Sequence, residues 1–131
     1  MTFVRKCNSF DIDGVIYMGE YDGIYPGPDD VIITGRSIEE MRETRAMLDK
    51  KGIKNELHLN PLPFDQKTRE SSGIHKGNVI NWLWSKGTLI QCHFEDDPIQ
   101  AAEIKKLCPN VNVILVQHDL VEKENVRHTE F

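Results

Sequence analysis

The sequence predicts an α/β fold, a three-layer α/β/α domain around a central, mostly parallel five-stranded sheet. Short apolar runs alternate along the chain with longer segments that carry helix-start and helix-stop residues. Strands joined by helical crossovers form parallel sheets between two helical layers. A length of 131 residues suffices for one such core, so a single folded domain is expected.

Five apolar runs are expected to form the strands. They span residues 3–10, 31–33, 56–59, 88–94 and 111–116. The last run is apolar except for Asn112, a pattern typical of a strand that is covered on both faces. A Pro-rich loop at 60–63 follows the third run, and the polar stretch 66–72 has no clear pattern.

Three helices are expected between these strands, at residues 38–50, 74–86 and 98–107. Ser37 has the pattern of an N-cap for the first helix, because Glu40 lies three residues later and completes a capping box. Pro98 stands in the first turn of the third helix, where proline is favoured. On the second helix we expect Trp84 in the core and Trp82 partly exposed.

The folded domain is expected to span residues 1–117, followed by a polar C-terminal tail at 118–131 that is predicted to be partly disordered. His118 and His128 of this tail are expected in solvent. No run approaches the roughly 20 apolar residues that a membrane span requires, and no signal-peptide pattern is present. No membrane association is therefore expected.

The composition is that of a globular protein without a basic surplus. Hydrophobic residues make up 39% and charged residues 28% of the chain, and 16 Lys and Arg against 21 Asp and Glu give a formal charge of -5. An extended nucleic-acid-binding surface is therefore not expected, because it would need excess positive charge. Cys7, Cys92 and Cys108 are odd in number and form no C-x-x-C motif. They predict reduced thiols and a cytoplasmic location.

Acidic residues follow the first and the fourth predicted strands, at the sheet edge where ligands bind in open parallel sheets. Asp11 and Asp13 are two residues apart, so an extended backbone points both toward one reacting centre. Two close carboxylates would repel an incoming phosphate by roughly 4 kcal/mol per pair of charges. A divalent cation reverses this repulsion, and Mg²⁺ prefers carboxylate, water and phosphate oxygens. We therefore expect Asp11 and Asp96 to bind Mg²⁺.

Four segments, in order along the chain, resemble the signatures of the haloacid dehalogenase-like (HAD) superfamily. Residues 9–16 (SFDIDGVI) resemble the DxDGT signature, with Val15 in place of threonine. Residues 33–36 (ITGR) resemble the second signature, a strand that ends in Ser or Thr. Lys76, expected at the start of a helix, matches the lone basic residue of the third, and residues 94–98 (FEDDP) match the acidic pair of the fourth. The resemblance implies a Rossmann-like catalytic domain.

The resemblance also implies a Mg²⁺-dependent phosphohydrolase, a phosphomonoesterase that works through an aspartyl-phosphate. Asp11 would attack the phosphorus atom. Asp13 would protonate the leaving oxygen and then deprotonate the hydrolytic water. Thr34, Gly35 and Lys76 would bind the phosphoryl oxygens and stabilise charge in the transition state.

For the metal, the resemblance implies direct binding by the carboxylates of Asp11 and Asp96 and by the backbone carbonyl of Asp13. Either Glu95 or Asp97 would assist through water, and the sequence leaves open which of them does. Arg36, at the end of the second signature, either reaches the substrate or forms a surface ion pair. Three residues are therefore secondary candidates: Glu95, Asp97 and Arg36.

The spacing between the signatures leaves no room for a cap domain. Only 20 residues (14–33) separate Asp13 from Thr34, and 41 residues (35–75) precede Lys76. The stretch 18–28, rich in Gly and Tyr, is expected to form a short flap. Capless relatives act on large substrates, so the phosphorylated substrate is expected to be a nucleotide, a polynucleotide end or a phosphoprotein. A partial lid formed by tyrosines of this region is the alternative.

Two other functions stay open at this point. One is a non-catalytic HAD-like binding or scaffold module, against which the intact Asp11, Asp13, Thr34 and Asp96 argue. The other is a phosphotransferase that passes the phosphoryl group to an acceptor other than water. A receiver domain of the two-component type does not fit, because its phosphorylated Asp follows the third strand.

Overall fold

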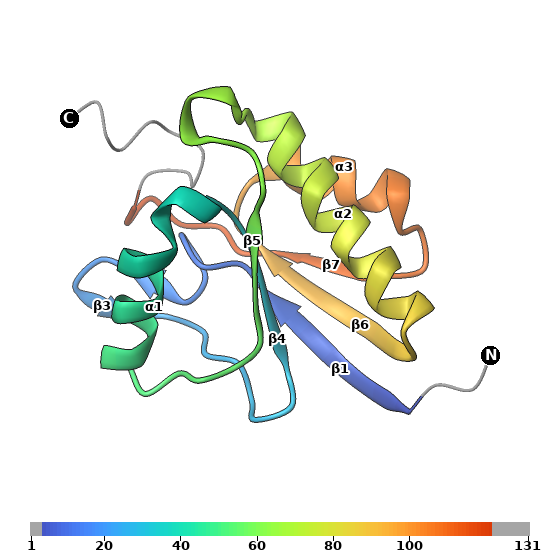
Figure 1. Ribbon diagram of the computed structural model, residues 1–131, viewed down its shortest axis with the longest axis horizontal. Helices are drawn as coiled ribbons and strands as arrows, with labels where there is room; N and C mark the ends of the chain where they lie inside the picture. The colour runs from blue at the N-terminus through green and yellow to red at the C-terminus, as the bar shows by residue number, and fades with distance from the viewer. Residues whose placement is uncertain (1–3, 122–131) are drawn as a thin grey trace.

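The computed structural model describes residues 4–121 and has a five-stranded, all-parallel sheet at its centre (Figure 1). The strands are β1 (Arg5–Phe10), β4 (Val31–Ser37), β5 (Leu57–Asn60), β6 (Thr88–Glu95) and β7 (Asn112–Leu115). Their order across the sheet is β5-β4-β1-β6-β7. The predicted α/β class is confirmed. The order makes β1 and β6 neighbours, so the acidic residues that follow them lie at adjacent strand ends.

Three α-helices cover the two faces of the sheet. Helices α2 (Arg69–Ser85) and α3 (Pro98–Leu107) pack against each other on one face, apart from α1 (Met41–Lys50) (Figure 1). Along β4 the side chains alternate between two cores, as the two-residue period of a strand requires. Val31 and Ile33 join the core that contains residues of α2 and α3, whereas Ile32 joins the core that contains Leu48 of α1. The sheet is therefore buried on both faces.

The chain leaves β4 through a capped turn. As predicted, Ser37 forms a capping box: its side chain accepts a hydrogen bond from the Glu39 backbone, and the Glu40 carboxylate accepts one from the Ser37 backbone. The cap starts a 3-10 turn, Ile38–Glu40, that leads into α1. The strand itself extends beyond the predicted 31–33, because Ser37 still pairs with Asn60 of β5.

Helix α2 begins earlier than the predicted 74–86. Thr68 is its N-cap, and its hydroxyl accepts a hydrogen bond from the Ser71 backbone while the Ser71 side chain accepts one from the Thr68 backbone. The stretch 66–72, for which the sequence showed no pattern, therefore contains the first turn of the helix. Lys76 lies about two turns inside α2. The prediction that Lys76 stands at a helix start is wrong.

Two predictions of burial are also wrong. Strand β7 is the last strand of the sheet, and Leu115 is 39% exposed, so this strand is not covered on both faces. Trp84 is 39% exposed rather than in the core, because the buried side of α2 is formed by other residues, among them Ile80 and Leu83. Trp82 is exposed, as predicted.

Where a flap was predicted over 18–28, the chain forms a small antiparallel hairpin of β2 (Tyr17–Met18) and β3 (Tyr21–Asp22). Within residues 4–121 no segment forms a separate cap domain. None of the helices in this range is long and apolar enough to cross a membrane. The predicted strand start at Phe3 and the tail beyond residue 121, with His128, lie outside the described residues.

Candidate active site

The candidate site lies at the carboxyl ends of β1, β4 and β6, three adjacent strands. Asp11 directly follows β1, Thr34 is the middle residue of β4, and Asp96 directly follows β6. Carboxylate oxygens of Asp11, Glu95 and Asp96 lie within 4.8 Å of one another, and all three residues are buried. We call these three residues the acidic cluster.

Lys76 of α2 reaches into the acidic cluster. Its Nζ donates a hydrogen bond to Glu95 Oε1 at 2.7 Å and lies 3.1 Å from Asp11 Oδ1. The Lys76 and Glu95 side chains are fully buried, and buried charges persist only when they are paired. Burial opposes ionisation of Glu95, but the Lys76 ammonium and the hydrogen bonds from His93 and Lys76 together lower the pKa of this carboxyl below its usual value. Glu95 is therefore ionised at neutral pH.

Arg36 forms a two-point ion pair with Asp13. Its Nε donates to Asp13 Oδ2 at 2.8 Å and its Nη2 to Asp13 Oδ1 at 2.6 Å. Its backbone N–H donates to Thr34 Oγ1 at 3.1 Å, and its Nη1 to Thr44 Oγ1 of α1 at 3.3 Å. The sequence left Arg36 between a substrate contact and a surface pair. In the structure Arg36 forms an ion pair, with the buried Asp13, and this pair holds the Asp13 carboxylate in one orientation.

Of the two acids that the sequence could not separate, Glu95 belongs to the acidic cluster. Asp97 accepts a hydrogen bond from the Ile99 backbone as the N-cap of α3, and Arg69 donates two bonds to it. Burial alone would raise the pKa of Asp97, but the hydrogen bonds from Arg69, the Ile99 backbone and Gln100, together with the Arg69 charge, lower it below its usual value. The dipeptide Asp97-Pro98 was a usable signal, because proline at the first helical position makes the preceding residue the cap.

His118 was expected in solvent, and this prediction is wrong. Its Nε2 lies 3.0 Å from Asp96 Oδ2, and the Leu120 backbone N–H donates to its Nδ1, so Nε2 is the nitrogen that donates. Gly14 makes room for this contact. Its φ is 86°, and a Cβ at this position would overlap the Asp96 and His118 side chains. No signal in the sequence pointed to His118, because the chain returns from β7 to the site only in the folded protein.

The acidic cluster has the donor atoms that a hard divalent cation requires. Ligand oxygens of a Mg²⁺ octahedron lie about 3–4 Å apart, close to the spacing of these carboxylates. Three carboxylates and the Lys76 ammonium carry a formal charge of minus two in a site almost excluded from water. One divalent cation would balance that charge. The residues therefore fit a divalent metal ion.

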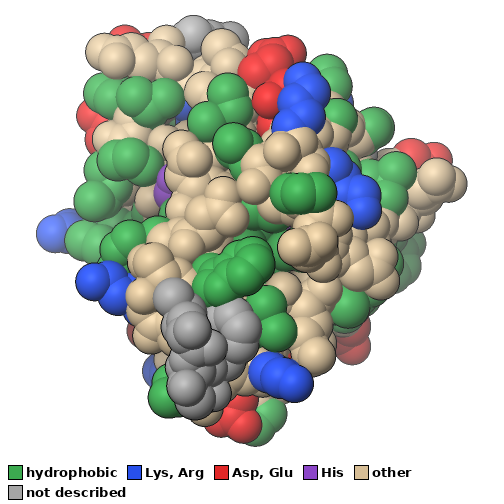
Figure 2. Space-filling view, turned by 90° about the vertical axis from the view of Figure 1, so that its right-hand side faces the viewer, with side chains coloured by type: hydrophobic (Ala, Val, Ile, Leu, Met, Phe, Trp, Pro, Cys, Tyr) green, Lys and Arg blue, Asp and Glu red, His purple; other side chains and the backbone are tan. Residues whose placement is uncertain are grey.

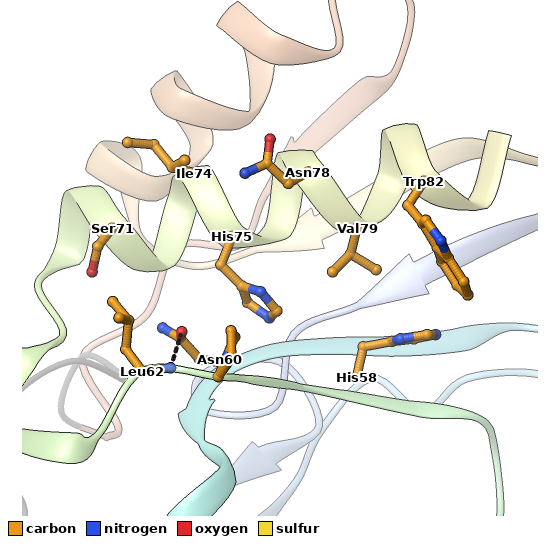
Figure 3. A pocket seen from close by; sticks show the side chains of 10 residues that line it. His58, Asn60, Leu62, Ser71, Ile74, His75, Asn78, Val79 and Trp82 are labelled. Carbon is orange, nitrogen blue, oxygen red and sulfur yellow. Dashed lines mark hydrogen bonds between the residues drawn. The ribbon is translucent and has the colours of Figure 1, made fainter. Parts of the chain in front are cut away.

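A pocket of about 570 Å³ lies between α2 and β5 (Figure 3). The rings of His58 and Trp82 meet edge to face at one end, 6.0 Å between centroids. The His75 ring points into the pocket and forms a hydrogen bond with the backbone of Thr34. Burial, with a smaller effect of the Lys76 charge, lowers the pKa of His75 from 6.5 to about 4. The imidazole next to Lys76 is therefore neutral at pH 7.

On the face shown in Figure 2, the coloured Lys and Arg side chains stand apart from one another. Hydrophobic side chains and the tan surface of other side chains and backbone lie between them (Figure 2). A continuous basic surface of the kind that follows a nucleic-acid backbone is not present among the residues coloured on this face.

No family model matches the chain, and no curated protein matches it. Among solved structures, the chain is similar to a chain of the Pnkp1/Rnl/Hen1 complex, with a TM-score of 0.62 and 14% sequence identity. The match covers 86% of this chain and 45% of that chain, so this chain spans less than half of that relative. At this identity the likeness shows a shared α/β fold.

Proposed function

We propose that this protein is a Mg²⁺-dependent phosphohydrolase of the HAD type, which hydrolyses phosphomonoesters through an aspartyl-phosphate at Asp11. The observation that carries this proposal is the acidic cluster with Lys76 inside it. The two excess negative charges of this buried site favour binding of a divalent cation. A divalent cation beside the Lys76 ammonium would in turn attract the negatively charged oxygens of a phosphoryl group. Asp13, held by Arg36 at the same sheet edge, supports the assignment of an acid–base partner.

The carboxylates of Asp11 and Asp96 and the backbone carbonyl of Asp13 would hold the ion. When bound, Mg²⁺ neutralises charge on the phosphoryl oxygens and so lets a carboxylate approach the phosphorus. Glu95 has a different task, because its Oε1 accepts from Lys76. It keeps the ammonium at the site.

In the first half of the reaction, a carboxylate oxygen of Asp11 forms a bond to phosphorus, and the bond from phosphorus to the leaving oxygen breaks. Protonated Asp13 gives its proton to that oxygen, so the product leaves as an alcohol. Thr34 and Gly35 of β4, together with Lys76, bind the equatorial oxygens of the transferring group.

In the second half, Asp13 has become the carboxylate and accepts a proton from water. The water oxygen forms a bond to phosphorus, and the bond between phosphorus and Asp11 breaks. Inorganic phosphate leaves, and both aspartates return to their starting states. The two hydrogen bonds from Arg36 hold the Asp13 carboxylate in one orientation for this second step.

The substrate is proposed to be a phosphomonoester on a large or extended molecule: a polynucleotide end, a phosphoprotein or a nucleotide. Within residues 4–121 only the β2–β3 hairpin stands where other members of the family resembled here carry a cap. An active site without a cap admits a substrate that a closed chamber would exclude.

Hydrolysis of p-nitrophenyl phosphate in the presence of Mg²⁺ tests the proposal. The wild-type protein should turn over this substrate, and Asp11→Asn should lower kcat on the order of 10⁴-fold or more, because the nucleophile is lost. Asp29→Asn is the matched control, since Asp29 is exposed and precedes β4 at the opposite edge of the sheet. It should keep wild-type activity.

A panel of phosphoesters then identifies the substrate class. It contains mononucleotides, oligonucleotides with 3′ or 5′ phosphates, and phosphopeptides, each assayed with Mg²⁺ and after chelation with EDTA. Turnover that survives EDTA would contradict the metal assignment. No turnover across the whole panel would favour a non-catalytic binding module, and transfer of phosphate to an added alcohol would favour a phosphotransferase.

A further inference from the structure

A row of buried polar side chains extends from Lys76 into the middle of the sheet. Ser9 Oγ of β1 lies 2.6 Å from His93 Nδ1 of β6, and His93 Nε2 lies 3.1 Å from Glu95 Oε1. The same Glu95 oxygen accepts the hydrogen bond from Lys76. All four residues are completely buried. The mechanism proposed above uses Lys76 and Glu95 but assigns nothing to Ser9 or His93.

The register of the sheet produces this row. Ser9 pairs with His93 across β1 and β6. Ser9 lies two residues before Asp11, and His93 lies two residues before Glu95, so each pair projects on the same side of its strand. That side is covered by α2, which supplies Lys76. One face of two adjacent strands thus carries a continuous polar connection to the proposed nucleophile.

The direction of the hydrogen bonds is fixed by Glu95. An ionised carboxylate can only accept hydrogen bonds, so His93 Nε2 must carry the proton and donate the hydrogen bond to Glu95. His93 Nδ1 then accepts from the Ser9 hydroxyl. Burial lowers the pKa of His93, which keeps its ring neutral and consistent with this single tautomer. Glu95 Oε1 therefore receives two donors, one from His93 and one from Lys76.

We propose that Ser9 and His93 are positioning residues for Lys76, and that they set how the Lys76 ammonium is shared between Glu95 and Asp11. This inference rests on the proposed function, in which Lys76 binds the phosphoryl oxygens. The ammonium lies closer to Glu95, at 2.7 Å, than to Asp11, at 3.1 Å. The bond from His93 stabilises part of the Glu95 charge and fixes its carboxylate. Without it, Lys76 would be drawn further onto Glu95 and away from Asp11.

Two substitutions of His93 separate positioning from packing. His93→Leu has a similar size but no donor, whereas His93→Gln keeps an amide N–H that can reach Glu95. His93→Leu should lower kcat and the affinity for inorganic phosphate by about tenfold, a loss typical of a displaced transition-state ligand. His93→Gln should stay within about twofold of the wild type. His58→Leu, a histidine change on β5 outside the row, is the matched control.

Kinetics, calorimetric titration with inorganic phosphate in Mg²⁺, and circular dichroism are measured on each variant. A folded His93→Leu protein with wild-type phosphate affinity would overturn the proposal. So would equal losses in His93→Leu and His93→Gln, because a packing role does not distinguish them. If His93→Leu does not fold, Ser9→Ala decides: a loss of about threefold or more in phosphate affinity supports the proposal, and unchanged affinity overturns it.

A second readout does not depend on turnover. The ¹⁵N resonances of His93 should show protonated Nε2 and unprotonated Nδ1 across the neutral pH range, and the opposite tautomer would overturn the proposal. A wild-type protein without phosphatase activity would refute the proposed function, while its phosphate affinities would still decide the role of His93. A wild-type protein that binds no phosphate would overturn both.

Discussion

Adjacent residues of α2, His75 and Lys76, face two regions of opposite character. Lys76 enters the acidic cluster, where every charged side chain is buried and held within hydrogen-bond distance of a partner of opposite charge or a polar donor. His75 faces the pocket between α2 and β5, whose walls are mostly apolar and whose end is formed by the exposed Trp82. Helix α2 thus lies between the acidic cluster, which is held together by buried ion pairs, and a mostly apolar pocket.

This difference predicts that the acidic cluster and the pocket tolerate substitutions to different degrees. A buried charge loses its hydration and depends on its partners, so removing one partner leaves an unbalanced charge behind. Removal of a half-exposed aromatic side chain costs only part of its apolar contacts, because water fills the space that it leaves. Substitutions in the acidic cluster should therefore have much larger effects than substitutions in the pocket.

Removal of the buried ammonium should have the largest effect. In Lys76→Met, Asp11 and Glu95 lose their shared cation, and the free energy of unfolding without metal should fall by about 3–5 kcal/mol. Mg²⁺ should restore part of the loss. Denaturant unfolding with and without Mg²⁺ measures both. Lys86→Met is the control, because Lys86 is exposed beside Trp82. A loss below about 1 kcal/mol in Lys76→Met would contradict the comparison.

The next largest loss of stability is expected for a substitution of Gly14, which lies against the Asp96 side chain. Gly14→Ala adds a Cβ that overlaps the Asp96 and His118 side chains, in addition to strain at positive φ, and should destabilise by about 1–3 kcal/mol. Gly52→Ala is a close control. Gly52 has a similar φ of 77°, but nothing lies within 4 Å of the added Cβ. Equal melting temperatures for the two variants would show that the overlap has no energetic consequence.

Loss of the arginine that holds Asp13 should affect activity more than stability. Arg36→Met removes both hydrogen bonds to Asp13, and misplacement of an acid–base group lowers kcat on the order of tenfold to hundredfold. Arg42→Met, at an exposed position of α1, should leave kcat unchanged. The assay is p-nitrophenyl phosphate hydrolysis. An equal kcat in both variants would show that Asp13 does not need this partner.

A smaller effect should appear in the dependence of stability on pH. The pKa of His75 is lowered to about 4 in the folded protein, from 6.5. The unfolded chain therefore binds the proton more tightly, and the contribution of His75 is complete above pH 6.5 and lost as the pH falls toward 4. His75→Gln should flatten this part of the stability profile, measured by urea unfolding between pH 7 and 4. An unchanged profile would place the loss on other groups.

The smallest effect on stability and activity is expected for a substitution in the pocket between α2 and β5. Trp82→Ala removes an exposed ring that touches His58 at the rim, and the free energy of unfolding should change by less than about 1 kcal/mol. Hydrolysis of p-nitrophenyl phosphate should be unchanged, because the proposed phosphate site lies at the acidic cluster and not in the pocket. A large loss of activity in Trp82→Ala would show that the two regions act together.

Local signals in the sequence predicted much of the framework. The capping box at Ser37 acts within four residues, and strand–helix alternation needs only the neighbouring residues and the rule that parallel strands share a carboxyl edge. Together they predicted that Asp11 and Asp96 follow strands at one edge. Where a local pattern was weak, as at the polar start of α2, the predicted boundary was wrong, and with it the place of Lys76.

The sequence by itself determined the α/β class, the central sheet and the sheet edge at which the acidic residues lie. Hydrophobic periodicity and helix caps are patterns of residues that are close together in the sequence, so they can be read without the fold. Only the tertiary structure decided which side chains meet there. Arg36 pairs with Asp13 across 23 residues, His118 with Asp96 across 22, and Ser9 with His93 across 84. Contacts over such separations depend on strand register and on the packing of α2, and no local pattern records them.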